Sequence, residues 1–251
     1  MLGHEIIGNG PKTIIVLHDW LDDTSAWSGA AVYLDRERYR WVLTDLRGYG
    51  RSRDQQGSYT AEEAGADVIA LADALEVTRF TIVGHSMSTL VAVYMAQRHP
   101  ERIERVVLLT PAPPSGFGAD DETLQGVWRL ARGDDDLRRG WLQKRFGERL
   151  SRGWVGHKLA RWRAAADPEA VAGYATMYAL RGVPEPTKRI SAPVLAITGE
   201  HDVESMRREP VTRMLAPICE QLKVTPIAEA GHYPMLETPP LLVALLEGFI
   251  G

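Results

Sequence analysis

The 251-residue sequence has a single cysteine and no long apolar run. Cys219 cannot form a disulfide within the chain, and it leaves no thiolate cluster for a metal. It follows the apolar residues 214–218, so we expect a small buried hydrophobic side chain rather than a reactive thiol. No apolar run approaches the roughly 20 residues that cross a bilayer, and the first residues lack the charged and apolar regions of a secretion signal. We therefore expect a soluble, cytoplasmic protein.

An excess of positive charge is also absent. Lysine and arginine number 29 and aspartate and glutamate 33, a formal net charge of -4. Proteins that bind nucleic acid usually carry a basic surface, so we expect neither nucleic acid nor a membrane as a partner. The expected ligand is a small-molecule substrate, and the sequence predicts no oligomeric state. It also has no cluster of histidine and carboxylate residues with metal-ligand spacing, so we predict no metal and no other cofactor.

What the sequence does contain is a series of short β-branched runs, each followed by a segment of helical character. Most runs are apolar without polar alternation, as in strands that helices cover on both faces. The pattern predicts the α/β class, with a doubly wound, mostly parallel sheet of about 7–8 strands and helices on both faces. The expected strands are residues 4–7 at the sheet edge, 13–17, 41–44, 80–83, 106–109, 194–198 and 222–227, and the expected helices include residues 61–75, 89–97 and 240–250.

The pattern changes between two proline-rich segments, residues 110–114 and 183–186. No strand is predicted between them, whereas Asp134 and Asp167 are suitable helix N-caps. We therefore predict a helical cap domain, residues 112–186, inserted into a core domain of residues 1–111 and 187–251. Most of its tryptophans should pack on the core, but aromatic side chains also dominate the walls of ligand cavities. The predicted substrate-binding residues are Phe117, Trp128, Trp141, Met177 and Tyr178.

The strongest chemical signal is the run Phe-Thr-Ile-Val-Gly-His-Ser-Met-Ser at residues 80–88. An apolar strand leads directly into a turn of small residues and then into a helix. Ser86 at the apex of such a turn has strained backbone angles and projects its hydroxyl above the sheet. The run resembles the nucleophile elbow, Gly-x-Ser-x-Gly, of the α/β-hydrolase superfamily, and the resemblance extends over essentially the whole chain. Ser88 replaces the last glycine of that pattern, so we expect less room where the helix approaches the strand.

A serine hydroxyl needs a base to remove its proton. His232 follows the last predicted strand and precedes the last helix, where the superfamily carries its catalytic histidine. After the strand at residues 194–198, Asp202 matches the family's Gly-x-x-Asp spacing, and Glu200 is the alternative. The order Ser86, Asp202, His232 along the chain is that of this fold. The resemblance thus implies a catalytic triad, while His85 next to the nucleophile is expected to point away from it.

The run His18-Asp19-Trp20 resembles the family's His-Gly-x loop, whose third residue offers a backbone amide to the oxyanion. The resemblance implies an oxyanion hole formed by the Trp20 and Met87 amides, each worth about 3 kcal/mol in rate. Asp19 departs from the pattern. A carboxylate that points into the site would oppose the developing negative charge and favour an unusual substrate. We expect instead that it points away and caps the loop, with His18 tying the loop down.

A serine nucleophile implies acyl transfer, in contrast to the aspartate of haloalkane dehalogenases and epoxide hydrolases. We therefore predict a serine hydrolase that cleaves a small carboxylic ester or lactone, with a mostly apolar group, through an acyl-enzyme. Two alternatives stay open. Similar enzymes with the same triad cleave carbon–carbon bonds or form peracids, and similar proteins with an intact triad serve as small-molecule receptors in which hydrolysis is slow or vestigial.

Overall fold

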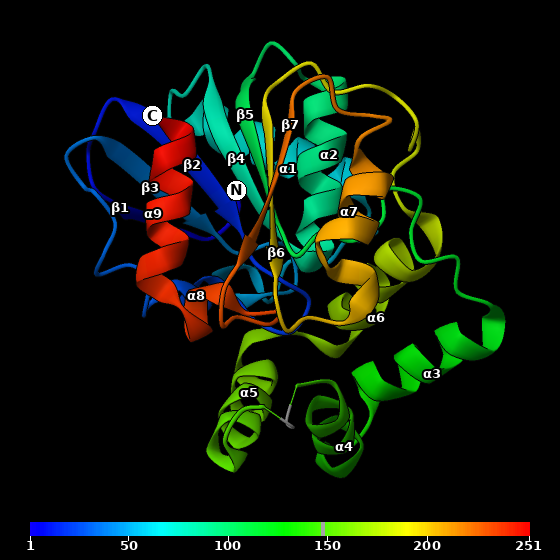
Figure 1. The fold of residues 1–251 in the computed structure, drawn as a ribbon. Coiled ribbons are helices and arrows are strands. Elements are labelled where there is room, and N and C mark those ends of the chain that lie inside the picture. The colour runs from blue at the N-terminus through cyan, green and yellow to red at the C-terminus, as the bar shows by residue number, and fades with distance from the viewer. Residues whose placement is uncertain (147–148) are drawn as a thin grey trace.

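Figure 1 shows the fold in a computed structural model that describes residues 1–146 and 149–251. Seven strands in these residues form one sheet in the order β1-β3-β2-β4-β5-β6-β7. The edge strand β1 runs antiparallel to β3, and all other neighbours are parallel, which confirms the predicted α/β class and sheet type. The strands are β1 (His4–Ile7), β2 (Lys12–Leu17), β3 (Tyr39–Thr44), β4 (Phe80–His85), β5 (Ile103–Leu109), β6 (Val194–Gly199) and β7 (Leu222–Ile227).

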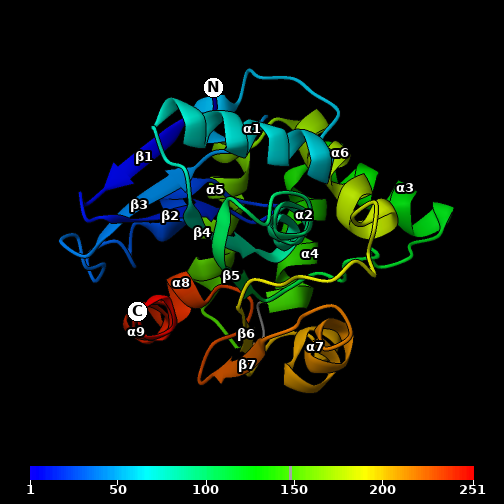
Figure 2. The same ribbon diagram turned by 90° about the horizontal axis from the view of Figure 1, so that it is seen from above.

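Successive residues of a central strand enter two different cores, one on each face of the sheet. Ile15 and Leu17 of β2 belong to the buried core that includes residues of α1, α2 and α7, whereas Ile14 and Val16 belong to the core that includes residues of α9. Side chains of a strand alternate between its faces, so a strand covered on both sides is a continuous apolar run. Figure 2 shows α1 and α9 on opposite sides of the sheet. The helices outside the segment between β5 and β6 are α1 (Ala61–Ala74), α2 (Thr89–Arg98), α7 (Arg208–Leu215), α8 (Pro234–Glu237) and α9 (Pro239–Ile250).

In the described residues between β5 and β6 the chain forms four further helices, of which α3, α4 and α5 lie below the sheet in Figure 1. Both predicted N-caps are present: the Asp134 carboxylate accepts a hydrogen bond from the Leu137 amide at 2.9 Å, and Asp167 caps a helix that begins with Pro168. The division into a core and a cap domain stays a prediction. These inserted helices are α3 (Asp121–Arg132), α4 (Asp135–Phe146), α5 (Arg152–Ala165) and α6 (Pro168–Thr176), followed by the π-helical turn η4 (Met177–Arg181).

Cys219 is buried in the apolar core, as predicted, and this burial raises the pKa of its thiol to about 11. The short helix α7 was not predicted. Its sequence begins Arg-Glu-Pro and buries only Val211 and Leu215, so the apolar periodicity is too brief to detect. Among the described helices, none is both long and apolar enough to span a bilayer.

Candidate active site

Ser86 lies at a sharp turn where β4 meets α2, and its φ of +53° is in the left-handed region. The turn is tight at Gly84, where an added Cβ would lie 2.6 Å from the Ser88 carbonyl oxygen. Ser88 contributes more than bulk here. Its hydroxyl accepts a hydrogen bond from the His85 amide at 2.9 Å and donates to the Leu17 carbonyl at 3.2 Å. The residue that replaces the family's glycine therefore ties the turn to the neighbouring strand β2.

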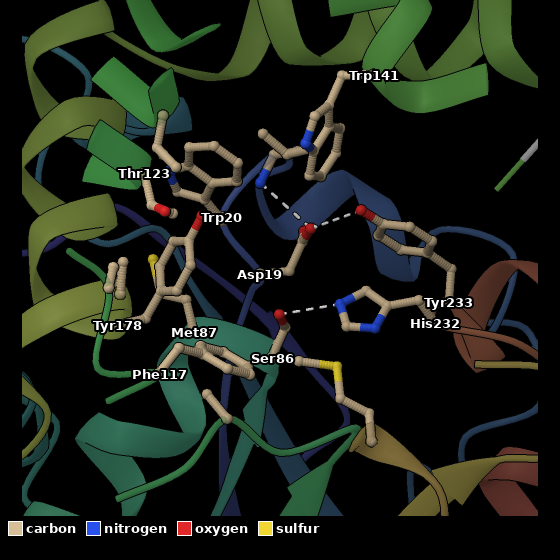
Figure 3. Close-up of a pocket in the computed structure, with 16 residues that line it drawn as sticks. Asp19, Trp20, Ser86, Met87, Phe117, Thr123, Trp141, Tyr178, His232 and Tyr233 are labelled. Carbon is tan, nitrogen blue, oxygen red and sulfur yellow. Dashed lines mark hydrogen bonds between the residues drawn. The ribbon is translucent and has the colours of Figure 1, made fainter. Parts of the chain in front are cut away.

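The structure brings the three predicted triad residues together in one chain of hydrogen bonds. Ser86 Oγ lies 2.9 Å from His232 Nε2 (Figure 3), and His232 Nδ1 lies 2.8 Å from Asp202 Oδ2. Asp202 follows β6, and His232 lies in the loop between β7 and α8. Both side chains are buried. The alternative carboxylate, Glu200, is exposed and accepts a hydrogen bond from the Glu229 amide at 3.1 Å instead.

The ring of His85 bonds to the backbone of the loop that carries His232. Its Nε2 lies 2.7 Å from the His232 carbonyl oxygen and donates to it. Burial lowers the pKa of His85 to about 4, so its ring is neutral near pH 7. The Thr110 hydroxyl donates to the same carbonyl at 3.4 Å. Two side chains thus hold the backbone of the loop that carries His232.

The loop after β2 is fixed on both sides. His18 Nε2 accepts a hydrogen bond from the Leu46 amide at 3.0 Å, which confirms that His18 ties the loop down. The Tyr49 hydroxyl donates to the Trp20 carbonyl at 2.8 Å, and the Trp20 indole donates to the Val171 carbonyl of α6 at 2.7 Å. Trp20 and Met87 both line the cavity above Ser86. Within residues 1–146 and 149–251, the Trp20 amide makes no hydrogen bond to another backbone group.

Asp19 combines the two orientations considered for it. Its Oδ2 accepts hydrogen bonds from the Leu21 amide at 3.2 Å, as a loop cap does, and from the Tyr233 hydroxyl at 3.0 Å. The side chain also lines the cavity, and its Oδ1 has no partner in the described part of the chain. Burial raises the pKa of this carboxyl, but opposing contributions, the largest of which is the positive charge of Lys158, outweigh burial and lower the pKa to about 2. Asp19 is therefore ionised near neutral pH.

Sequence reasoning missed a buried charged cluster that joins α5 to the loop after β2. Lys158 Nζ lies 3.0 Å from Asp22 Oδ2 and 3.9 Å from the centre of the Tyr233 ring. Arg161 Nε donates to Asp22 Oδ1 at 2.7 Å, and its Nη2 donates to Asp23 at 2.7 Å. Nothing in the helical pattern distinguishes Lys158 from the basic residues that face solvent. The neighbouring Asp22-Asp23 pair was the one available signal.

A cavity of about 220 Å³ lies above Ser86. Three of the predicted substrate-binding residues line it: Phe117, Trp141 and Tyr178 (Figure 3). Trp128 and Met177 do not. The Trp128 indole donates to the Thr176 hydroxyl at 3.0 Å, and Met177 is buried in the core, because neighbouring positions of a helix face different directions. The other lining residues are Asp19, Trp20, Leu21, Ser86, Met87, Ala112, Ala119, Thr123, Val127, Ala179, Met206, His232 and Tyr233.

The sequence model of one protein family, described as the alpha/beta hydrolase fold, matches residues 12–151, which include β2, the loop after it and the Ser86 turn. The chain belongs to the α/β-hydrolase family. Its mostly parallel sheet and its serine at the β4–α2 turn agree with that membership.

Relatives of this α/β-hydrolase match it over nearly the whole chain. It is 26% identical over 249 residues to a protein named 3-oxoadipate enol-lactonase 2 from Acinetobacter baylyi, covering 95% of this chain and 88% of the relative. A solved enol-lactonase from Burkholderia xenovorans LB400 superposes with a TM-score of 0.84 at 25% identity, covering 99% and 96% of the two chains. A thermophilic esterase from Thermogutta terrifontis, at 23% identity, shares the fold with a TM-score of 0.83, covering 99% and 92%.

One group of side chains in this α/β-hydrolase lies close enough to share a metal ion. It consists of Glu200, His201 and Glu229, all of them exposed. Exposed acidic groups of this kind are common without an ion, and the group is not part of the cavity lining. The chemistry available at the cavity is that of a hydroxyl, an imidazole and a carboxylate held in line.

Proposed function

We propose that this α/β-hydrolase cleaves a small carboxylic ester or lactone through an acyl-enzyme formed on Ser86. One observation carries the proposal: the Ser86 hydroxyl, the His232 imidazole and the Asp202 carboxylate form a continuous chain of hydrogen bonds at the wall of a mostly apolar cavity. The names of the enol-lactonase relatives support the same class of reaction.

In the proposed reaction, Ser86 Oγ attacks the acyl carbon while His232 Nε2 takes the hydroxyl proton. The buried Asp202 carboxylate stabilises the imidazolium that forms and holds its Nδ1–H in place. His232 then gives the proton to the departing alcohol oxygen, which leaves an ester of Ser86. A water molecule, deprotonated by His232, attacks this ester, and His232 returns the proton to Ser86 Oγ as the acid is released.

The negative charge on the tetrahedral intermediate would be held by the Trp20 and Met87 amides. Trp20 is suited to this role because its own carbonyl and indole are bound to Tyr49 and Val171, so the loop does not need to move. Met87 lies in the first turn of the helical segment after Ser86, where amides have no partner within the helix.

The experiment uses 4-nitrophenyl esters of short acids, a set of lactones and a fluorophosphonate probe. We expect turnover and labelling of the peptide that contains residue 86. Ser86→Ala should lower kcat/KM by at least about a thousandfold. The matched control, Ser115→Ala at an exposed serine, should change neither.

Two results would contradict the proposal. Turnover that persists in Ser86→Ala would remove Ser86 as the nucleophile. If the wild-type protein neither turns over these compounds nor is labelled, yet is thermally stabilised by them, the protein is a receptor. Including a β-diketone among the substrates separates ester cleavage from carbon–carbon cleavage, because the products differ.

A further inference from the structure

We propose that Asp19 makes the catalytic cavity select esters with a positively charged group and reject esters with a carboxylate. The inference concerns the substrate class and rests on the proposed hydrolase function. Asp19 is a buried carboxylate in the loop whose Trp20 amide would bind a developing negative charge, and a second negative charge is unusual at such a place.

No lysine or arginine lines the described part of the cavity beside Asp19. Among the described lining residues, Asp19 is the one carboxylate. The two groups that bind Asp19 Oδ2 are an amide and a phenol, which are uncharged donors, and Asp19 Oδ1 has no partner in the described residues. Oδ1 is itself buried, so Asp19 would act on a ligand through its negative charge rather than through a hydrogen bond, and a ligand with a positive charge is favoured.

The nearby cluster offsets the Asp19 charge only in part, although Lys158 lowers the pKa of Asp19. Lys158 forms its ion pair with Asp22, and Arg161 binds Asp22 and Asp23. The cluster and Asp19 together hold three carboxylates and two cations, which leaves a net charge of one negative unit. The carboxylates are Asp19, Asp22 and Asp23, and the cations are Lys158 and Arg161. At a partly desolvated site, a unit charge about 5 Å from another changes binding on the order of a hundredfold.

The aromatic wall is the second, independent observation. The Trp20 ring lies 5.8 Å from the Trp141 ring and 5.3 Å from the Tyr178 ring, both in edge-on arrangements. Figure 3 shows these rings around Asp19, with Tyr233 on the other side. The faces of aromatic rings attract cations, and aromatic cages of this kind bind ammonium groups. A carboxylate within such a wall fits a substrate with an alkylammonium group.

The test compares matched esters. Butyrylcholine is measured against its uncharged isostere 3,3-dimethylbutyl butyrate, and mono-4-nitrophenyl glutarate against 4-nitrophenyl hexanoate. We expect kcat/KM of the cationic ester to exceed that of its isostere about tenfold, and that of the anionic ester to lie about a hundredfold below its partner. Asp19→Asn keeps the shape of the side chain and removes its charge. This variant should reduce both the preference for the cationic ester and the discrimination against the anionic ester about tenfold.

Glu200→Gln is the matched control, because it removes an exposed carboxylate and should leave both ratios unchanged. Equal rates for the anionic and neutral esters in the wild type, or unchanged ratios in Asp19→Asn, would overturn the inference. If that variant does not fold, competitive inhibition of the wild type decides: choline should inhibit at least tenfold more strongly than 3,3-dimethylbutan-1-ol, and equal inhibition overturns it. The proposed function fails separately, if no ester is hydrolysed or if Ser86→Ala stays active.

Discussion

Lys158 Nζ lies 3.0 Å from Asp22 Oδ2, and neither side chain is exposed to solvent. This ion pair joins helix α5 to the loop that follows β2. Removing both charges from water is costly, and the cost is offset only when each charge keeps its partner. The pair therefore makes the position of α5 and the position of the Trp20 loop depend on each other.

Lys158→Met should destabilise the protein by about 3 kcal/mol, because the Asp22 charge would stay buried with Arg161 as its one remaining cation. Urea denaturation followed by circular dichroism measures the change. The control is Arg161→Met, whose side chain is 21% exposed and whose loss should cost less. The double variant Lys158→Met with Asp22→Leu should recover most of the stability. A loss below about 1 kcal/mol in Lys158→Met would show that the pair does not hold the two elements together.

The contrast between Lys158 and the triad shows what a sequence can predict. Ser86, Asp202 and His232 each follow or precede a strand in a recognisable local motif, and a parallel sheet brings its strand ends together. Lys158 and Asp22 are 136 positions apart, and neither belongs to a recognisable local motif. Their pairing depends on how α5 packs against the loop. Tertiary packing of this kind leaves no periodic pattern, so it could not be predicted from the sequence.

The same distinction applies to the cavity wall. Phe117, Trp141 and Tyr178 line the cavity, whereas Trp128 does not, although all four were predicted from aromatic content alone. Aromatic content identifies which segments can supply a wall, but the rotation of each helix decides which of its residues do so.

The buried His85 predicts how stability depends on pH. Its pKa is lowered from 6.5 to about 4 in the folded state, so between these values the unfolded chain binds a proton that the folded chain does not. The free energy of unfolding should therefore fall as the pH falls through this window, by up to about 3 kcal/mol. Denaturation at pH 7 and pH 4.5 measures this. His85→Gln, which keeps a side-chain donor, should show a smaller fall; an equal fall in both proteins would exclude His85 as the cause.

Ser88 gives a prediction at the position where the family pattern has glycine. Ser88→Gly should destabilise the protein by about 2 kcal/mol, because the buried His85 amide would lose the hydroxyl that accepts its hydrogen bond. Ser88→Ala should have a similar effect, and the exposed control Ser115→Ala should have little. Chemical denaturation measures all three. A Ser88→Gly variant as stable as the wild type would mean that the hydroxyl only fills space.

The last prediction separates backbone strain from chemistry at Ser86. A φ of +53° is disfavoured for any residue with a Cβ, by about 1 kcal/mol or more, and glycine avoids this cost. Ser86→Gly and Ser86→Ala both remove the hydroxyl and its hydrogen bond to His232, so they differ only in the strain and in the flexibility of the unfolded chain. We expect the glycine variant to be the more stable of the two by up to about 1 kcal/mol in urea denaturation. The direction of this difference identifies strain at residue 86. At an unstrained helical position, such as the exposed Ala70 of α1, replacing alanine with glycine should instead lower the stability by about 1 kcal/mol. If Ser86→Ala proves more stable than Ser86→Gly, the turn at residue 86 is not strained in solution.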